Sequence, residues 1–378
     1  SVRRSGHVMS AYIGLDVHMD WSFVTVLDQT GRVVVQKRLE NELVPSFLEN
    51  FNVLKVGLEA STHVAPLYRA LVNKGLRVEV SHPKKTRYIA EARIKSDRVD
   101  SKAIAELVRL DALPQSFMPP PEIAALREKV RRRAFLVRER AKLMTKIRGV
   151  LAYEGVKHPE GLNIFTRKGV DWLGSLGLEP VDCYLRVMMV LNGDIRRLSH
   201  ELRRLAGLDD DVRLLMTIPG VGYYTALLVK AEIGDVSRFM SGDHLCSYAG
   251  LVPSTYSSGG VSRHGGITRE GSRWLRWAMV EAAMTHIKYD TGITRSYHRI
   301  AEKRGRQTAI VASARRLLLC CYSVLKHKRP YRPFVYGQAF MNPREFAGPF
   351  CGRARDWWCL DAEPYCPLCW AYRRMPFI

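Results

Sequence analysis

Four carboxylates occur where side chains from separate elements can meet. Asp16 ends the segment YIGLD, and Glu59 ends the segment GLE. Asp97 and Asp100 are three residues apart, which places them on one face of a helix start. Carboxylates placed in this way favour Mg²⁺, a hard cation that prefers octahedral oxygen ligands. Two metal ions about 3.5–4 Å apart can activate a nucleophile and hold a leaving oxygen, so the pattern predicts phosphoryl transfer.

The carboxylates also have structural explanations. Asp97 alone could be an ordinary acidic residue of a first helical turn, where it interacts favourably with the helix dipole. Asp16 and Glu59 are harder to explain in this way, because a carboxylate on an apolar strand is costly without partners. A shared metal site accounts for all of them.

The elements that must position these carboxylates follow from apolar periodicity. Alternation of apolar and polar residues predicts strands, and spacing by three and four predicts helices. The expected strands are 11–17, 23–27, 33–39, 54–58 and 76–80, with a turn at 29–31 and helices at about 65–74 and 97–109. Three antiparallel strands followed by alternating helices and strands is the order of an α/β RNase H-like (RuvC-like) fold. Many other α/β domains also begin with a hairpin.

Two long helices are expected after the proline run 119–121. Apolar residues of the second helix recur in steps of four and three, which predicts a coiled-coil seam. The seam residues are Tyr184, Met188, Leu191, Ile195, Leu198, Leu202 and Leu205. These helices could pair within one chain or with a second subunit, and the second alternative predicts a homo-oligomer, a dimer or tetramer. The expected domains are 9–112, a helical spacer at 119–207, 208–335, and a cysteine-containing tail at 336–378.

The domain at 208–335 is expected to be mainly α-helical. Segment 217–222 is similar to the turn of a helix-hairpin-helix motif, whose glycines, here Gly220 and Gly222, let backbone N–H groups approach a phosphate. A purely structural turn is the alternative. A Gly/Ser-rich loop at 254–271 should lead to a Trp-rich helix at 273–286, and 304–328 should form a final basic helix.

The charge balance points to a polyanionic partner. The chain has 59 Lys and Arg against 37 Asp and Glu, a formal net charge of +22. Nucleic acid is the first candidate for this partner, and an anionic membrane surface is the other. The apolar content of 47% excludes a disordered chain. Because no apolar run reaches about 18 residues and no signal peptide is evident, we expect no membrane span.

The cysteines divide between the body and the tail of the chain. Those of the body lie in core-like segments, which predicts a reduced, cytoplasmic protein. The pair Cys366 and Cys369 has zinc-knuckle spacing, so Zn²⁺ in the tail is a further expectation. Its partners, Cys351 and Cys359, are spaced unusually, and an extension with incidental cysteines is the alternative.

At the four carboxylates, and at several motifs further along the chain, the sequence resembles a known family. These are the bacterial insertion-sequence transposases with an Asp-Glu-Asp-Asp RuvC-like domain and a C-terminal serine domain, also called bridge-RNA-guided recombinases. The matching segments are YIGLD at 12–16, LEAST at 58–62, KSDRVDSKA at 95–103, IPGVG at 218–222, AGLVP at 249–253, YSSGG at 256–260 and ITREGSRWLR at 267–276. No single motif is decisive, but the ordered set, from about residue 11 to 335, is specific.

The resemblance implies a nucleophile. The family pattern places a catalytic serine just before a glycine, five residues after the proline of Gly-Leu-x-Pro, which is Ser258 when counted from Pro253. The adjacent Ser257 is the alternative, and without the family pattern a flexible Ser/Gly loop would be the simpler interpretation. The serine would attack a DNA phosphodiester, form a covalent phosphoserine and release a 3′-OH that later rejoins, with carboxylate-bound Mg²⁺ activating the hydroxyl.

Cationic residues flank this serine. They are Arg263, His264, Arg269, Arg273 and Arg276. They could hold the phosphate and stabilise its developing charge, or they could only neutralise the nucleic-acid backbone.

The resemblance also implies partners, namely donor and target DNA and a structured noncoding guide RNA whose base pairing selects the sequence. Two other classes of protein remain open. A hydrolytic nuclease, such as a junction resolvase, would use the carboxylates and water without a serine. A non-catalytic nucleic-acid-binding scaffold would use only the helical parts.

Overall fold

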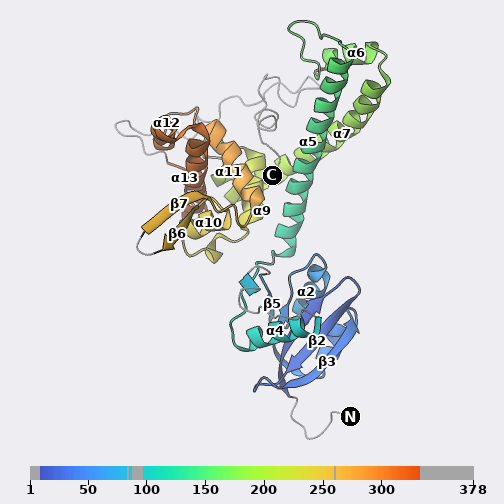
Figure 1. Cartoon of the computed structure of the whole chain (residues 1–378), viewed down its shortest axis with the longest axis vertical. Helices are drawn as coiled ribbons and strands as arrows, with labels where there is room; N and C mark the ends of the chain where they lie inside the picture. Colours follow the sequence, from blue (N-terminus) through green and yellow to red (C-terminus); the bar gives the residue numbers. More distant parts are fainter. Residues whose placement is uncertain (1–8, 83–84, 87–96, 259–260, 333–378) are drawn as a thin grey trace. The chain divides into compact units, whose positions relative to one another are not determined.

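The computed structural model describes residues 9–82, 85–86, 97–258 and 261–332 (Figure 1). The chain forms two compact units with their boundary between Met118 and Pro119. The tail cysteines, and with them the expected zinc site, lie outside the described residues.

The first unit is built on a five-stranded sheet with the order β3-β2-β1-β4-β5. Its strands are β1 (Ser10–Val17), β2 (Trp21–Leu27), β3 (Val33–Glu40), β4 (Asn52–Leu58) and β5 (Val78–Val80). The first three strands pair antiparallel, while β4 pairs parallel to β1 and β5 parallel to β4. The expected strands are therefore confirmed, and this mixed sheet is consistent with an RNase H-like domain.

Among the described residues, the helices that accompany the sheet include α1 (Val44–Leu48), α2 (Val64–Asn73) and α4 (Asp97–Arg109). Glycine at two strand positions lets α4 lie unusually close to the sheet. A Cβ added at Gly14 would lie 2.0 Å from the carbonyl oxygen of Ser101, and one added at Gly57 would lie 2.4 Å from Val108 Cγ2. The two glycines thus set the distance between α4 and the strands β1 and β4.

The second unit begins with a helical hairpin. Helix α5 (Pro121–Tyr153) leads through α6 (Arg167–Ser175) into α7 (Glu179–Leu208), which returns beside α5 (Figure 1). The predicted seam on α7 faces this intrachain partner: Ile195 and Leu202 are fully buried, and Leu198 is 8% exposed. The structure has the α7 helix paired within one chain, which was one of the two alternatives. Ile195, Leu198 and Leu202 are therefore not available to a second subunit.

This burial predicts the outcome of a substitution on α7. Leu202→Asp should destabilise the fold by about 3–5 kcal/mol, because it places an unpaired charge in a closed core. Val190→Asp on the same helix is a matched control, because Val190 is 67% exposed and a surface substitution usually changes stability by about 0.5 kcal/mol or less. Denaturant unfolding of both variants measures the difference. Equal stability of the two would contradict the intrachain packing of the seam.

The rest of the second unit is mostly helical. Its helices are α8 (Asp210–Leu215), α9 (Tyr223–Ile233), the 3₁₀ turn Val236–Arg238, α10 (Gly242–Tyr248), α11 (Arg273–His286), α12 (Gly292–Arg304) and α13 (Arg306–His327). The Trp-rich helix has its predicted bounds. The final basic helix does not, because Gly305, with a φ of +82°, ends α12 and α13 starts after it.

The prediction of a Gly/Ser-rich loop at 254–271 was wrong. Strands β6 (Pro253–Ser258) and β7 (Val261–Ile267) form an antiparallel hairpin there. The pairing of Ser258 with Val261 leaves two glycines between the strands, and Gly-Gly between two short runs is a hairpin signal. The polar composition of these strands concealed that signal.

By length and composition alone, α13 is apolar enough to cross a membrane, and it is the one such helix among the described residues. No such segment was expected from the sequence. Several of its side chains, including Leu317, Leu318 and Cys321, are fully buried in the core of the second unit. Its apolar character is therefore that of a core helix.

Candidate functional site: a carboxylate cluster and a serine hairpin

The structure brings the four carboxylates to one place in the first unit. Asp16 lies near the end of β1, Glu59 directly follows the parallel strand β4, and Asp97 and Asp100 occupy the first turn of α4. One carboxylate oxygen from each of Asp16, Glu59 and Asp100 lies within 4.8 Å of the others. All four residues line one pocket of about 730 Å³.

Hydrogen bonds fix the elements that carry these side chains. The backbone N–H of Glu59 donates to the carbonyl of Leu15 at 2.9 Å, which holds Glu59 level with Asp16. The hydroxyls of Ser101 and Thr25 are 2.8 Å apart in the fully buried contact between α4 and β2. Arg98 Nε also donates to the side-chain oxygen of Gln36 on β3 at 2.7 Å. The first turn of α4 is thus attached to two strands.

The electrostatics of the cluster would favour a bound cation. Burial raises the pKa of Asp16, a side-chain hydrogen bond with Glu59 lowers it, and the charges of Asp97 and Asp100 raise it further. The net direction is upward, so the charged form of Asp16 is disfavoured in the absence of positive charge. An oxygen-only donor set of this kind fits a hard divalent cation.

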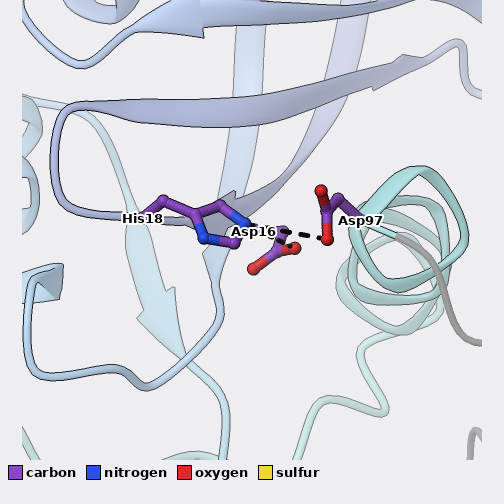
Figure 2. Close-up of side chains that lie close together, drawn as sticks. All are labelled: Asp16, His18 and Asp97. Atoms are coloured by element: carbon purple, nitrogen blue, oxygen red, sulfur yellow. Dashed lines mark ion pairs between the residues drawn. The ribbon is translucent and has the colours of Figure 1, made fainter.

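His18, which was not predicted from the sequence, faces the same cluster (Figure 2). Its Nε2 lies 3.4 Å from Asp16 Oδ2 and 3.7 Å from Asp97 Oδ1, and these three residues form a second group of candidate ligands. The imidazole stacks on Trp21, with ring centroids 4.0 Å apart. The available signal was the spacing of two from Asp16, because alternate residues of an extended chain face the same side.

The predicted nucleophile lies in the second unit. Ser258 is the last residue of β6, and Ser257 pairs with Ser262. Arg263 and His264 lie on β7, opposite Tyr256 and Thr255. The side chains of 255–264 lie outside the described part of the chain, so the choice between Ser257 and Ser258 stays a prediction.

The remaining predicted residues have distinct surroundings. Arg269 and Arg273 are exposed. Arg276 instead donates from Nη1 to the carbonyl of Ala249 at 2.8 Å, and burial lowers its pKa. A Cβ at Gly220 would lie 2.6 Å from the carbonyl oxygen of Ala282, so this glycine is needed for packing, whereas Gly222 is exposed at the start of α9. A phosphate contact at the 217–222 turn stays a prediction.

Both units match known protein families. Residues 13–153, which contain all four carboxylates, match the DEDD domain of IS110 transposases, described as "Transposase". Residues 212–299, which contain the hairpin and α11, match the "Transposase IS116/IS110/IS902 family". The chain carries the transposase domains of the IS110/IS116 family. Such enzymes catalyse DNA strand transfer, and the DEDD domain implies the use of a divalent metal ion.

Two similar transposases extend over most of this chain, and a third similar protein over about a third of it. A transposase for insertion sequence element IS1111A from Coxiella burnetii is 27% identical, over 85% of this chain and 91% of its own length. A probable family 20 transposase from Pseudomonas aeruginosa is 26% identical, over 85% of this chain and 98% of its own. A pilin gene-inverting protein from Moraxella bovis is 32% identical, over 36% of this chain and 45% of its own. The non-catalytic scaffold is therefore not favoured.

Proposed function

We propose that this transposase is an RNA-guided recombinase that cleaves and rejoins DNA through a covalent phosphoserine at Ser258. Asp16, Glu59, Asp97 and Asp100 would hold Mg²⁺. The observation that carries the metal-dependent part is the convergence of three carboxylate oxygens within 4.8 Å inside the matched DEDD domain. The position of Ser258 at the end of β6, inside the second matched domain, supports the serine part.

The proposed step conserves phosphodiester bonds. The Ser258 oxygen attacks phosphorus, the bond from phosphorus to the 3′ oxygen breaks, and the proton lost by serine is balanced by the one gained at the 3′-OH. The reverse attack by a different 3′-OH restores serine and joins new partners, so no energy-rich cofactor is needed. Mg²⁺, when bound, polarises the oxygens of the reaction. The protein's carboxylates position it, and exposed cations such as Arg269 and Arg273 neutralise phosphate charge.

A guide RNA and a homo-oligomer complete the proposal. The net charge of +22 suits a protein that binds the backbones of donor DNA, target DNA and a structured RNA while base pairing selects the sequence. Recombination needs several strand cuts, and each serine makes one, so the active complex would contain more than one copy. The contact between copies would use a different surface, because four of the seven seam residues on α7 are buried within the chain: Met188, Ile195, Leu198 and Leu202.

Salt dependence tests the mode of DNA binding. Between about 50 and 200 mM salt, affinity for a non-specific duplex should fall about 10³- to 10⁵-fold if six to ten phosphates are contacted, because bound phosphates release counterions. Fluorescence anisotropy of a labelled duplex, without guide RNA, measures this. A flat response would contradict backbone-led binding.

One experiment separates this proposal from a hydrolytic nuclease. The purified protein is incubated with its flanking noncoding RNA and with donor and target DNA, and the mixture is analysed under denaturing conditions. The proposal expects joined product together with a serine–DNA adduct. Cleavage in which water ends the reaction, without an adduct or joined product, would favour a nuclease that uses the carboxylate cluster alone.

A further inference from the structure

An aromatic and cationic cluster lies at the start of α11, and of its residues Arg273 alone is also one of the cations predicted to flank the serine. Trp274 has three guanidinium groups around it: those of Arg131 and Arg138 on α5 are each 5.8 Å from its ring centroid, and that of Arg273 is 5.9 Å away. Trp277 meets the ring edge-on, with centroids 6.1 Å apart. Trp274 packs on the core of this unit but is only partly buried.

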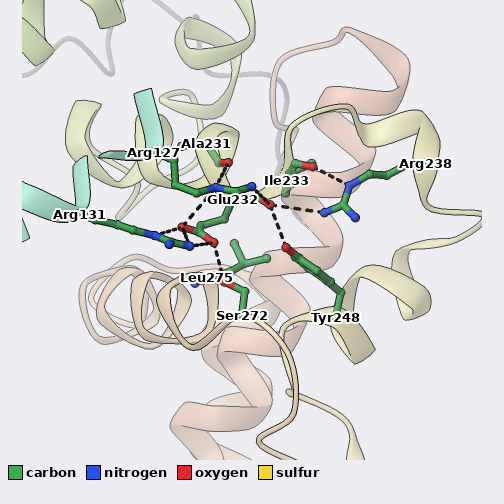
Figure 3. Close-up of polar contacts among 9 residues, drawn as sticks. All are labelled: Arg127, Arg131, Ala231, Glu232, Ile233, Arg238, Tyr248, Ser272 and Leu275. Atoms are coloured by element: carbon green, nitrogen blue, oxygen red, sulfur yellow. Dashed lines mark hydrogen bonds and ion pairs between the residues drawn. The ribbon is translucent and has the colours of Figure 1, made fainter. Parts of the chain in front are cut away.

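A buried network holds this cluster in place (Figure 3). Glu232, only 1% exposed, accepts hydrogen bonds from Arg131 Nε at 2.8 Å and from Arg131 Nη2 at 2.9 Å. The hydroxyl of Ser272, the N-cap of α11, donates to the same carboxylate at 2.8 Å. The start of α11 is therefore tied to α5, and Trp274 is presented on a rigid support.

The cluster keeps positive charge around a partly exposed ring. Glu232 balances Arg131, whereas Arg138 and Arg273 have no ion pair or hydrogen bond within the described residues. The three guanidinium groups lie 5.8–5.9 Å from the Trp274 ring centroid, at the outer limit of a cation–π contact. By comparison, Arg238 lies 4.1 Å from the ring centroid of Phe239. A flat ligand with a nearby negative charge matches these features.

We propose that Trp274, with Arg138 and Arg273, binds an unpaired base of a DNA strand next to the cleavage point. Bases stack on aromatic side chains while neighbouring cations hold the phosphates, which is the usual way in which proteins bind single strands. DNA is favoured because residues 268–272 alone separate α11 from β7 of the serine hairpin. Strand exchange also exposes unpaired DNA at that point. This inference rests on the proposed function for its location.

Equilibrium binding of three labelled probes tests the proposal: oligothymidine, a DNA duplex and oligouridine of equal length. The protein is the full chain carrying Ser258→Ala, so the test does not depend on serine chemistry. Trp274→Ala should weaken oligothymidine binding about 5- to 100-fold, the loss of one stacked base. Trp274→Tyr keeps an aromatic face and should stay within a few-fold. Duplex binding should change less than about twofold in both.

Salt titrations separate stacking from charge. Trp274→Ala should leave the slope of log affinity against log salt unchanged, whereas the double variant Arg138→Gln/Arg273→Gln should reduce the slope for oligothymidine by about 0.7 for each lost phosphate contact. Trp172→Ala, in α6 of the same unit, is the control and should alter neither. If Trp274→Ala unfolds, the tyrosine and arginine variants decide the question.

Three results would overturn the assignment. Equal loss for duplex and single strand would make the cluster a general backbone contact. Loss confined to oligouridine would make it an RNA surface. A folded Trp274→Tyr protein as weak as Trp274→Ala would leave only a packing role. None of these results affects the adduct assay, so failure here and failure of the recombinase proposal are distinguishable.

Discussion

Ser258→Ala is expected to abolish the covalent protein–DNA adduct and to lower formation of joined product by about 10⁴-fold or more, because no other oxygen would take the place of the nucleophile. Binding of DNA and RNA should be unchanged, since one hydroxyl contributes little to contacts dominated by phosphate charge. The measurement is a denaturing gel of end-labelled DNA, on which the adduct migrates as a slow, protease-sensitive band.

Two other serines of the hairpin serve as controls. Ser254 donates to the carbonyl of Gly266 at 2.9 Å, so Ser254→Ala tests a structural hydroxyl of β6 and should leave adduct formation intact. Ser257→Ala should also form the adduct. Loss of the adduct in Ser257→Ala alone would move the nucleophile by one residue. Normal cleavage in every variant would exclude serine chemistry and favour the hydrolytic nuclease.

The parts of the fold that local pattern dictates could be predicted from the sequence. Alternation placed β1, β2 and β3 within two residues of their bounds, and helical periodicity gave Asp97–Arg109 for α4. The meeting of Asp16, Glu59 and Asp100 followed from these elements, because parallel β1 and β4 end at the same edge and α4 begins beside it. A strand end is a strong positional signal, since few carboxylates are tolerated on apolar strands.

Contacts between distant segments could not be predicted in this way. The partner of the α7 seam was undecided, because a heptad pattern specifies an apolar face but not what covers it. The bonds from Glu232 to Arg131 and Ser272 join α9, α5 and α11, and no single-sequence periodicity reports such pairs. His18 was missed for a similar reason: one histidine after a strand is unremarkable until Asp97 is brought beside it.

Asp16→Asn is expected to reduce cleavage at least about 10³-fold, because it removes a charged ligand from the centre of the cluster. It should not harm the fold in the absence of metal. The folded state raises the pKa of Asp16, so at neutral pH the ionised carboxylate favours the unfolded chain, and a neutral side chain of equal size removes that penalty.

Thermal unfolding with and without metal separates the removal of the buried charge from the loss of the metal ligand. In EDTA the Tm of Asp16→Asn should equal or exceed that of the unsubstituted protein. Added Mg²⁺ or Mn²⁺ should raise the Tm of the unsubstituted protein, because a ligand that binds only the folded state stabilises it, and should do little for the variant. Asp20→Asn is the matched control, since Asp20 lines the same pocket but belongs to neither group of candidate ligands. It should retain both the metal-dependent rise and cleavage. An equal rise in Asp16→Asn, or full cleavage by it, would rule out a metal ion held by this cluster.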